Sequence, residues 1–176
     1  MRWNTLFRAF VLASIAAIAP SSAKAQVTTT PQALDRAVGY LASQLLAIGE
    51  AMPEDHFNSS PNKGTSTFAQ QLKHVAINNY LSAAIVSQQP EPSVVGNAPD
   101  TKTKEAVLAY LRASFDDVRK AIAALDEGTA IQPVKSGDRM VLPLGVVIGI
   151  IAHGWNHYGQ TTQYLRAVGV VPPASR

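Results

Sequence analysis

The chain has 176 residues, with 15 Lys and Arg against 12 Asp and Glu, and it contains no cysteine. Without cysteine, a disulfide, a thiol nucleophile and a thiolate metal ligand are all excluded. The basic excess comes from Arg2, Arg8 and Lys24, since removing residues 1–25 leaves 12 basic and 12 acidic residues. The rest of the chain is formally neutral, so its composition does not indicate a nucleic-acid-binding protein.

Residues 1–25 have the pattern of a secretory signal peptide. A basic start is followed by an apolar segment at 9–19 and by the small-residue cleavage pattern A-K-A at 23–25. An uncleaved N-terminal anchor is the alternative, although the apolar segment is shorter than the roughly 20 residues of a membrane span. We expect a periplasmic or secreted protein, with no membrane segment after cleavage, in which residues 26–176 form a single domain.

The first helix is predicted to begin at Thr30 and Pro31, a capping hydroxyl followed by proline at the first helical position. Gly49 and Pro53 are expected to end it. Residues 53–65 then read as a loop containing His56, which is expected either to be solvated or to reach a site at the end of the bundle. The buried face of this helix is marked by apolar residues three and four apart: Leu34, Val38, Leu41, Leu45 and Ile48.

The second helix is predicted to begin near Ser66 or Thr67, with Thr67 and Gln70 forming a capping box, and to run to about Ser87. His74 lies in its middle. We expect the imidazole of His74 to point toward the core, because three apolar residues share its helical face: Ile77, Leu81 and Ile85.

A third helix is predicted after a proline-rich segment that ends at Asp100 and Thr101, either of which can cap it. Asp116 and Asp117 are adjacent, so they diverge by about 100° around the helix and are expected to be surface charges. The apolar face of this helix is predicted to comprise six residues: Leu108, Leu111, Phe115, Val118, Ile122 and Leu125.

The fourth helix is predicted to start near Leu142 and Pro143 and to end at Gly169, before two prolines that forbid its continuation. Its apolar run at 141–152 is too short for a bilayer span and is expected to be buried on several sides. One line along this helix changes from apolar to polar side chains, in the order Val146, Gly149, His153, His157, Gln160 and Tyr164.

Four amphipathic helices without a strand pattern predict an all-α fold, a four-helix bundle. The connections at 53–65, 88–100 and 127–140 are predicted to be loops. They are long enough for antiparallel hairpins or for crossovers, so these lengths leave the order of the helices open.

His153 and His157 are four residues apart, so one helical face presents both imidazoles to a single point, as in metal-binding helices. His74 supplies a third imidazole from another helix. Three neutral imidazoles with an open position suit Zn²⁺, and Ni²⁺ or Fe²⁺ also accept nitrogen ligands. The alternative is a buried polar network without a metal. Three amides are candidates to hydrogen-bond the rings or a bound water: Asn78, Asn156 and Gln160.

The pattern F-x-x-x-L-x-H-V at 68–75 and the pattern H-x-x-x-H-Y-G-Q-x-x-x-Y-L-R-x-x-G-x-V-P-P at 153–173 resemble the DinB/YfiT-like superfamily. The resemblance implies a four-helix bundle, often a homodimer, with a divalent metal on His74, His153 and His157. Some members of that superfamily use low-molecular-weight thiols as cosubstrates, in thiol transfer or in maleylpyruvate isomerisation. The metal is then expected to activate the thiol as a thiolate.

We therefore expect an exported metal-dependent enzyme, similar to a thiol transferase or a hydrolase, that acts on a small molecule such as a thiol. Tyr158, Gln160 or His56 would orient the substrate. The alternative is a non-catalytic bundle protein that binds a metal or a small ligand. No glutamate lies between His153 and His157, so the metalloprotease helix motif is absent, as is a glycine-rich phosphate loop.

Overall fold

The computed structural model describes residues 28–98 and 103–175. The predicted signal peptide and the predicted cap at Asp100 or Thr101 lie outside these residues. Four long helices dominate the described chain: α1 (Thr30–Ala51), α2 (Phe68–Ser87), α4 (Lys104–Ala123) and α5 (Pro143–Ala167). The connections carry short helices and strands: η1 (Glu54–His56), α3 (Ser93–Gly96), η2 (Thr129–Ile131), β1 (Val134–Ser136), β2 (Arg139–Val141) and η3 (Pro173–Ser175).

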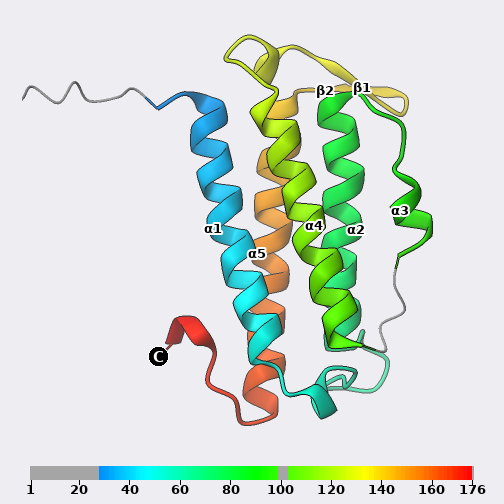
Figure 1. The fold of residues 1–176 in the computed structure, drawn as a ribbon, viewed down its shortest axis with the longest axis vertical. Helices are drawn as coiled ribbons and strands as arrows, with labels where there is room; N and C mark the ends of the chain where they lie inside the picture. Colours follow the sequence, from blue (N-terminus) through cyan, green and yellow to red (C-terminus); the bar gives the residue numbers. More distant parts are fainter. Residues whose placement is uncertain (1–27, 99–102, 176) are drawn as a thin grey trace, which may run out of the picture.

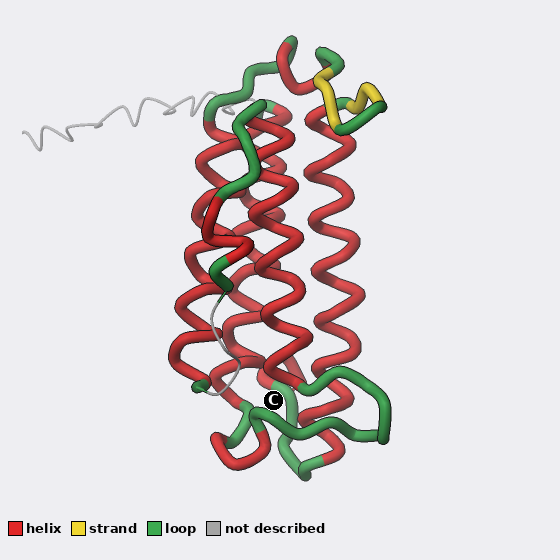
Figure 2. Tube along the Cα trace, turned by 90° about the vertical axis from the view of Figure 1, so that its right-hand side faces the viewer, coloured by secondary structure: helices red, strands yellow, loops and turns green. Residues whose placement is uncertain are grey.

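The long helices form a bundle in which α1 and α5 run in one direction and α2 and α4 run in the other (Figure 1). Around the bundle their order is α1, α4, α2 and α5, because each of these helices packs against the next and α5 packs against α1. Since α2 and α4 are parallel, their connection returns along the bundle, and α3 lies on this return path (Figure 2). The predicted all-α fold is confirmed. The loop lengths left the order of the helices open, and the connection from α2 to α4 is a crossover between two parallel helices.

The helix ends follow ordinary capping chemistry. α2 begins with the predicted capping box: Gln70 N–H donates to Thr67 Oγ1 at 3.2 Å, and Thr67 N–H donates to Gln70 Oε1 at 2.8 Å. α1 has an equivalent box one residue earlier than predicted, with Thr29 rather than Thr30 as the cap. α5 ends at Ala167, two residues before the predicted Gly169, whose φ of +78° allows a left-handed turn after the helix.

α1 ends at Ala51, between Gly49 and Pro53, the two residues predicted to end it, so Gly49 itself is still helical. A Cβ atom at position 49 would collide with the side chain of Leu108 and lie 3.1 Å from Leu72. This glycine therefore serves the close approach of α1 to α2 and α4, and it is not a helix stop.

Residues 127–140 were predicted to be a loop, but they contain part of a β-hairpin. β1 pairs antiparallel with β2, with Val134 opposite Val141. Gly137 has a φ of +59° in the two-residue turn, a conformation that glycine adopts without steric cost. Strands of three residues are too short to show the apolar–polar alternation that identifies strands in a sequence.

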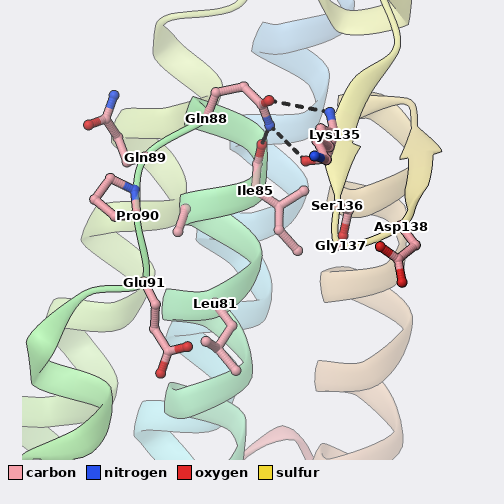
Figure 3. Close-up of a pocket in the computed structure, with 11 residues that line it drawn as sticks. Leu81, Ile85, Gln88, Gln89, Pro90, Glu91, Lys135, Ser136, Gly137 and Asp138 are labelled. Carbon is pink, nitrogen blue, oxygen red and sulfur yellow. Dashed lines mark hydrogen bonds between the residues drawn. The ribbon is translucent and has the colours of Figure 1, made fainter.

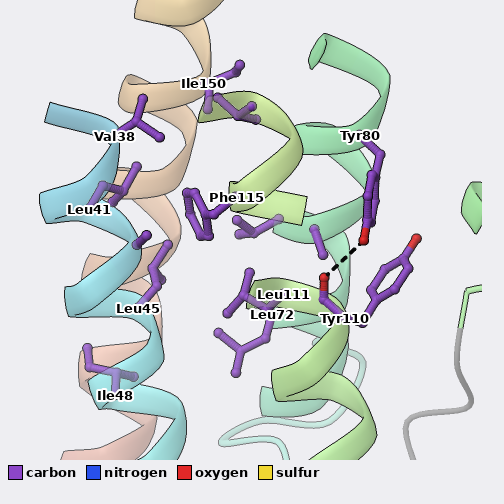
Figure 4. Packing of buried hydrophobic residues seen from close by; sticks show 14 of the residues in the cluster. Val38, Leu41, Leu45, Ile48, Leu72, Tyr80, Tyr110, Leu111, Phe115 and Ile150 are labelled. Atoms are coloured by element: carbon purple, nitrogen blue, oxygen red, sulfur yellow. Dashed lines mark hydrogen bonds between the residues drawn. The ribbon is translucent and has the colours of Figure 1, made fainter. Parts of the chain in front are cut away.

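The core lies between the facing sides of the four long helices (Figure 4). Every one of these helices contributes completely or almost completely buried side chains. Full burial of a leucine or phenylalanine side chain stabilises the fold by about 1.5–3 kcal/mol. Large side chains in this core include Leu41, Leu45, Ile48, Leu72, Leu111, Phe115 and Ile150.

The apolar start of α5 is less buried than predicted. Ile148 is 53 % exposed and Leu142 is 42 % exposed, whereas Val147 and Ile150 are buried. This part of α5 therefore packs along one side and leaves the other side to solvent. In the described part of the chain, no helix combines the length and the hydrophobicity needed to cross a membrane.

A bidentate ion pair joins α1 to α4 and generates a test of the fold. Arg119 Nε and Nη2 donate to the two Asp35 carboxylate oxygens at 2.7 and 2.9 Å, and these hydrogen bonds lower the pKa of Asp35 below its ordinary value. A carboxylate whose pKa is lowered by folding adds stability above the pKa it has when unfolded. That stability is lost as the pH falls through its folded-state pKa.

We predict that Asp35→Asn lowers the free energy of unfolding at pH 7 by about 0.5–1 kcal/mol, since the pair is partly exposed. The difference from the unsubstituted protein should shrink toward zero below the ordinary pKa of aspartate. Urea unfolding between pH 7 and pH 3 measures it. Asp116→Asn, at an exposed carboxylate of α4, is the control and should have a smaller effect. A difference for Asp35→Asn that is as large at pH 3 as at pH 7 would contradict the assignment.

Candidate metal centre

The structure brings His74 of α2 together with His153 and His157 of α5. The Nε2 atom of His153 lies 3.1 Å from Nε2 of His74 and 3.1 Å from Nε2 of His157. One ligand atom from each of the three histidines lies within 4.8 Å of the others. Among the described residues, no carboxylate joins this group. The cluster is therefore built from nitrogen donors alone.

Helix packing explains this convergence. α2 and α5 are antiparallel neighbours, and His153 and His157 are one turn apart on the side of α5 that faces α2. Gly154 lies between them in sequence, on the side toward α1. A Cβ atom at this position would collide with the side chain of Leu41, so glycine lets α1 pack closely against α5 at the level of the histidines.

The cluster lies at the edge of the bundle and not in its core. His157 is 8 % exposed and His153 is half-buried, but His74 is exposed. The expectation that His74 points toward the core is wrong, because the buried side of α2 carries Leu72, Val75, Ala76 and Asn79 instead. The three ring nitrogens therefore meet at the boundary between α2 and α5, where solvent or a ligand can approach from the side of His74.

Gln71 orients the most buried of the three rings. Nδ1 of His157 lies 2.6 Å from Gln71 Oε1, and a carboxamide oxygen can only accept, so this nitrogen carries the proton. Nε2 of His157 then has a free lone pair directed at the other histidines. Gln71 Nε2 lies 3.5 Å from the Tyr164 hydroxyl, which donates to the Ser66 carbonyl oxygen at 2.6 Å. A chain of hydrogen bonds thus supports the ring.

Sequence reasoning missed Gln71. The only signal was its position three residues before His74, which puts both side chains on neighbouring parts of one helical face. Its partner His157 is 86 residues away in sequence. The contact therefore depends on the register of α5 against α2, which the spacing within either helix does not reveal.

The surroundings keep the buried histidines neutral. Burial, together with the neighbouring His153 and His74, lowers the pKa of His157 to about 4. Burial also lowers the pKa of His153, again with a contribution from His74. Near neutral pH these two imidazoles are uncharged and able to donate lone pairs, as metal ligands must be.

The donor set fits a divalent metal ion. Ligand nitrogens of a tetrahedral zinc site, each about 2.0–2.1 Å from the metal, lie roughly 3.3 Å from one another. The observed Nε2 separations of 3.1 Å are close to that value. Nδ1 of His153 is buried without a hydrogen-bond partner among the described residues, and a metal ion held by Nε2 would leave it so.

The other predicted site residues are less closely associated with the histidines. Asn78 and Gln160 are half-buried and Asn156 is exposed, and in residues 28–98 and 103–175 no hydrogen bond joins these amides to a histidine. The ring of Tyr158 packs against Trp155, with ring centroids 5.1 Å apart.

His56 lines a separate cavity of about 280 Å³ together with Tyr164, near the end of α5. The structure therefore does not bring His56 into the histidine cluster. The rest of the lining comes from the loop after η1 and from the end of α5: Ser59, Ser60, Pro61, Ala167 and Val168.

Comparison with solved structures shows a common fold at low sequence identity. A DinB-like protein from Bacillus cereus ATCC 10987 is similar with a TM-score of 0.71 and 13 % identity, over 83 % of this chain and 97 % of that one. A DinB-like protein from Bacillus subtilis has a TM-score of 0.64 and 14 % identity, over 78 % and 92 %. A conserved protein from Enterococcus faecalis has a TM-score of 0.68 and 14 % identity, over 81 % and 98 %.

The search of curated proteins found no match to this chain. The family model described as the DinB family matches residues 40–176, which include all three clustered histidines and all of α2, α4 and α5. The resemblance expected from the two sequence patterns is thereby confirmed. The chain belongs to the DinB family.

Proposed function

We propose that this protein is an exported, metal-dependent enzyme that holds one divalent cation, Zn²⁺, Ni²⁺ or Fe²⁺, on His74, His153 and His157. The observation that carries the proposal is the meeting of three imidazole Nε2 atoms, without a carboxylate among the described residues, at a solvent-accessible edge of the bundle. When bound, such a cation acts as a Lewis acid that activates a water or a thiol. The pattern of residues 1–25 supports export.

The residues of the chain have distinct tasks in this proposal. Gln71 holds the His157 ring in the tautomer that presents Nε2, and the buried surroundings keep His157 uncharged. The exposed position of His74 leaves one side of the centre open to a small substrate. No described carboxylate lies in the cluster, so we assign no general base to the protein.

The second candidate is a non-catalytic protein that binds a metal or a small ligand. The same absence of a described carboxylate beside the histidines favours it, because hydrolytic metal sites commonly pair the metal with an acidic residue. Turnover separates the two candidates. Metal-dependent consumption of thiol-reactive electrophiles or of simple esters supports the enzyme, whereas a stoichiometric metal without turnover of either class supports the binding protein.

We predict that His153→Ala removes the metal. Elemental analysis of the protein purified without a histidine tag should give about one Zn, Ni or Fe per chain, and the variant should retain much less, because two nitrogen ligands remain where three converge. His56→Ala is the matched control, since His56 lines another cavity and should not change the stoichiometry. Equal metal content in the His153→Ala variant and the unsubstituted protein would refute the ligand assignment.

We predict that Gln71→Leu weakens metal binding by about 10–100-fold, because loss of a hydrogen-bond partner of a ligand ring typically has this effect. The variant keeps a side chain of similar size but cannot accept the proton of His157 Nδ1. Competition with a chromophoric chelator measures the affinity. Gln163→Leu, at an exposed position of α5, is the control. An unchanged affinity for Gln71→Leu would show that packing alone orients His157.

A further inference from the structure

The outer surface of α5 carries almost no charge. Residues 140–165 contain no aspartate, glutamate, lysine or arginine, so Arg166, in the last turn, is the one residue of these types in α5. A helix on the surface of a bundle ordinarily turns charged side chains toward water. The side of α5 that faces away from the core therefore lacks a usual feature of a surface in permanent contact with solvent.

Apolar side chains form a second line on α5, beside the line that enters the core. The second line recurs at spacings of four and three residues: Leu144, Ile148, Ile151, Trp155 and Tyr158. Ile148 is 53 % exposed and the other four are half-buried. The core line comprises other residues, all of them buried: Val147, Ile150, Gly154, His157 and Thr161. One helix thus has two lines of the kind that pack against a partner, and the core covers only one of them.

α1 continues this surface. Tyr40 is 60 % exposed, and its ring centroid lies 5.7 Å from that of Trp155. The residues of α1 on the side of Tyr40 are again four and three apart, and most are alanine: Ala33, Ala37, Gln44 and Ala47. Asp35 and Glu50 instead pair with arginines of α4. The two lines form one uncharged surface, the α1–α5 face, with Arg36 at its rim.

Small residues leave the α5 side of this face open to a close approach. Gly145, Ala152 and Gly159 are seven residues apart, and all three are exposed. A Cβ atom added at Gly145 or Gly159 would meet no neighbouring atom of the described chain within 4 Å, whereas at Gly154 it would collide with Leu41. Glycine is less favourable than alanine inside a helix. Packing within the chain explains Gly154, and the close approach of a helix from outside would explain Gly145 and Gly159.

The dimensions of the α1–α5 face fit a contact between two proteins. At 1.5 Å per residue, the two lines run together for about 28 Å, and two adjacent helices are about 20 Å wide. The footprint is therefore roughly 550 Å², and the accessible area is larger because side chains roughen the surface. Stable contacts cover about 800 Å² on each partner. The face is thus close in size to one side of a stable interface.

The absence of charge favours a second copy of this chain as the occupant. In a two-fold dimer each face meets its own copy, so a face with charges of one sign would repel itself, whereas an uncharged face does not. A lipid surface would instead favour several lysines or arginines beside the apolar side chains. The α1–α5 face has Arg36 at its rim and Arg166 at its end, too few for strong attraction to anionic lipid.

Another partly apolar surface of the molecule has a different character. A cavity of about 740 Å³ lies between the second half of α2, the segment after α2 and the β-hairpin (Figure 3). Leu81 and Ile85 belong to its apolar wall. Its lining also includes charged residues of both signs: Glu91, Lys135 and Asp138. Such a surface suits exposure to water, so the absence of charge is specific to the α1–α5 face.

We propose that the α1–α5 face binds a second copy of this chain about a two-fold axis, with Tyr40, Ile148 and Trp155 at the centre of the contact. The small residues of α5 let the helix of the second copy approach its backbone. His153 and Trp155 are two residues apart and point about 160° apart around α5, so the histidine cluster stays accessible in the dimer. The contact does not depend on a bound metal.

Sedimentation equilibrium of the chelator-treated protein tests the proposal. We expect a dimer with a dissociation constant of about 1 μM or lower, as for other contacts of this size. Tyr40→Glu and Ile148→Glu each place a carboxylate in the contact and should weaken the dimer at least about 100-fold. Met140→Glu, at an apolar residue of β2 that is 63 % exposed, is the matched control and should leave the dimer unchanged.

Two results would overturn the proposal. One is a protein that stays monomeric at about 100 μM. If that monomer also pellets with vesicles of phosphatidylethanolamine and phosphatidylglycerol, the occupant of the face is a lipid surface. The other is a dimer that both Tyr40→Glu and Ile148→Glu leave intact.

Gly159→Leu separates loss of the dimer from loss of the fold. Leucine forms helices better than glycine, and a Cβ atom at this exposed position meets no neighbouring atom of the described chain, so the Tm of the dilute monomer should not fall. In the dimer the added side chain lies where the second copy approaches, and the dissociation constant should rise at least about tenfold. An unchanged dissociation constant would contradict close packing at this face.

Spin labels locate the contact, because the chain has no cysteine of its own. A nitroxide on Ser43→Cys, at an exposed position of α1 beside the face, should lie much closer to its copy in the dimer than a nitroxide on Lys120→Cys, at an exposed position of α4. Pulsed electron paramagnetic resonance measures both distances. A shorter distance between the labels on α4 would place the contact on another side of the bundle and overturn the assignment.

Discussion

The site depends on one packing relationship, the antiparallel contact of α2 with α5. Only this contact brings the ring nitrogen of His74 to 3.1 Å from that of His153, across 79 residues of sequence. It also sets the His157 ring against Gln71 of α2, so that one helix supplies both a converging imidazole and the acceptor that orients another. A change in the register of α5 by a single residue would turn its side chains by about 100° and separate all of these groups.

The fold was largely predictable because its determinants are local. The spacing of apolar residues identifies four helices, and Thr67 with Gln70 marks the start of α2 correctly. The errors also have local causes. Gly49 resembles a helix stop in sequence, but it is required where Leu108 and Leu72 approach α1. The hairpin has strands of three residues, too short for a period of two to be recognised.

The site was predictable only in part, because it depends on contacts between helices. The spacing of His153 and His157 predicts that the two rings meet. The exposure of His74 could not be predicted from its apolar neighbours Ile77 and Leu81, because the core side of α2 is the adjacent stripe that contains Leu72 and Val75. When a helix has two adjacent apolar faces, the sequence does not show which of them packs against the core.

The histidines lie at the edge of the bundle, so the residues that form the site are different from the residues that form the core. The large buried side chains, such as Leu45 and Phe115, lie between the helices, whereas the three imidazoles meet on the outside of the contact between α2 and α5. A bundle of this kind can keep its core pattern while its surface changes. The similarity of this chain to DinB-like structures at 13–14 % identity is consistent with such a division.

The same division separates the hairpin from the histidine cluster. The hairpin is tied to α2 through the side chain of Gln88, and its exposed residues add little to the core. Its charged side chains can therefore change without the loss of a packed residue, while a change at Gln71 or His157 disturbs a hydrogen bond between two helices. The geometry of the histidine cluster is therefore fixed by the contact of α2 with α5, and the side chains of the hairpin can vary independently of it.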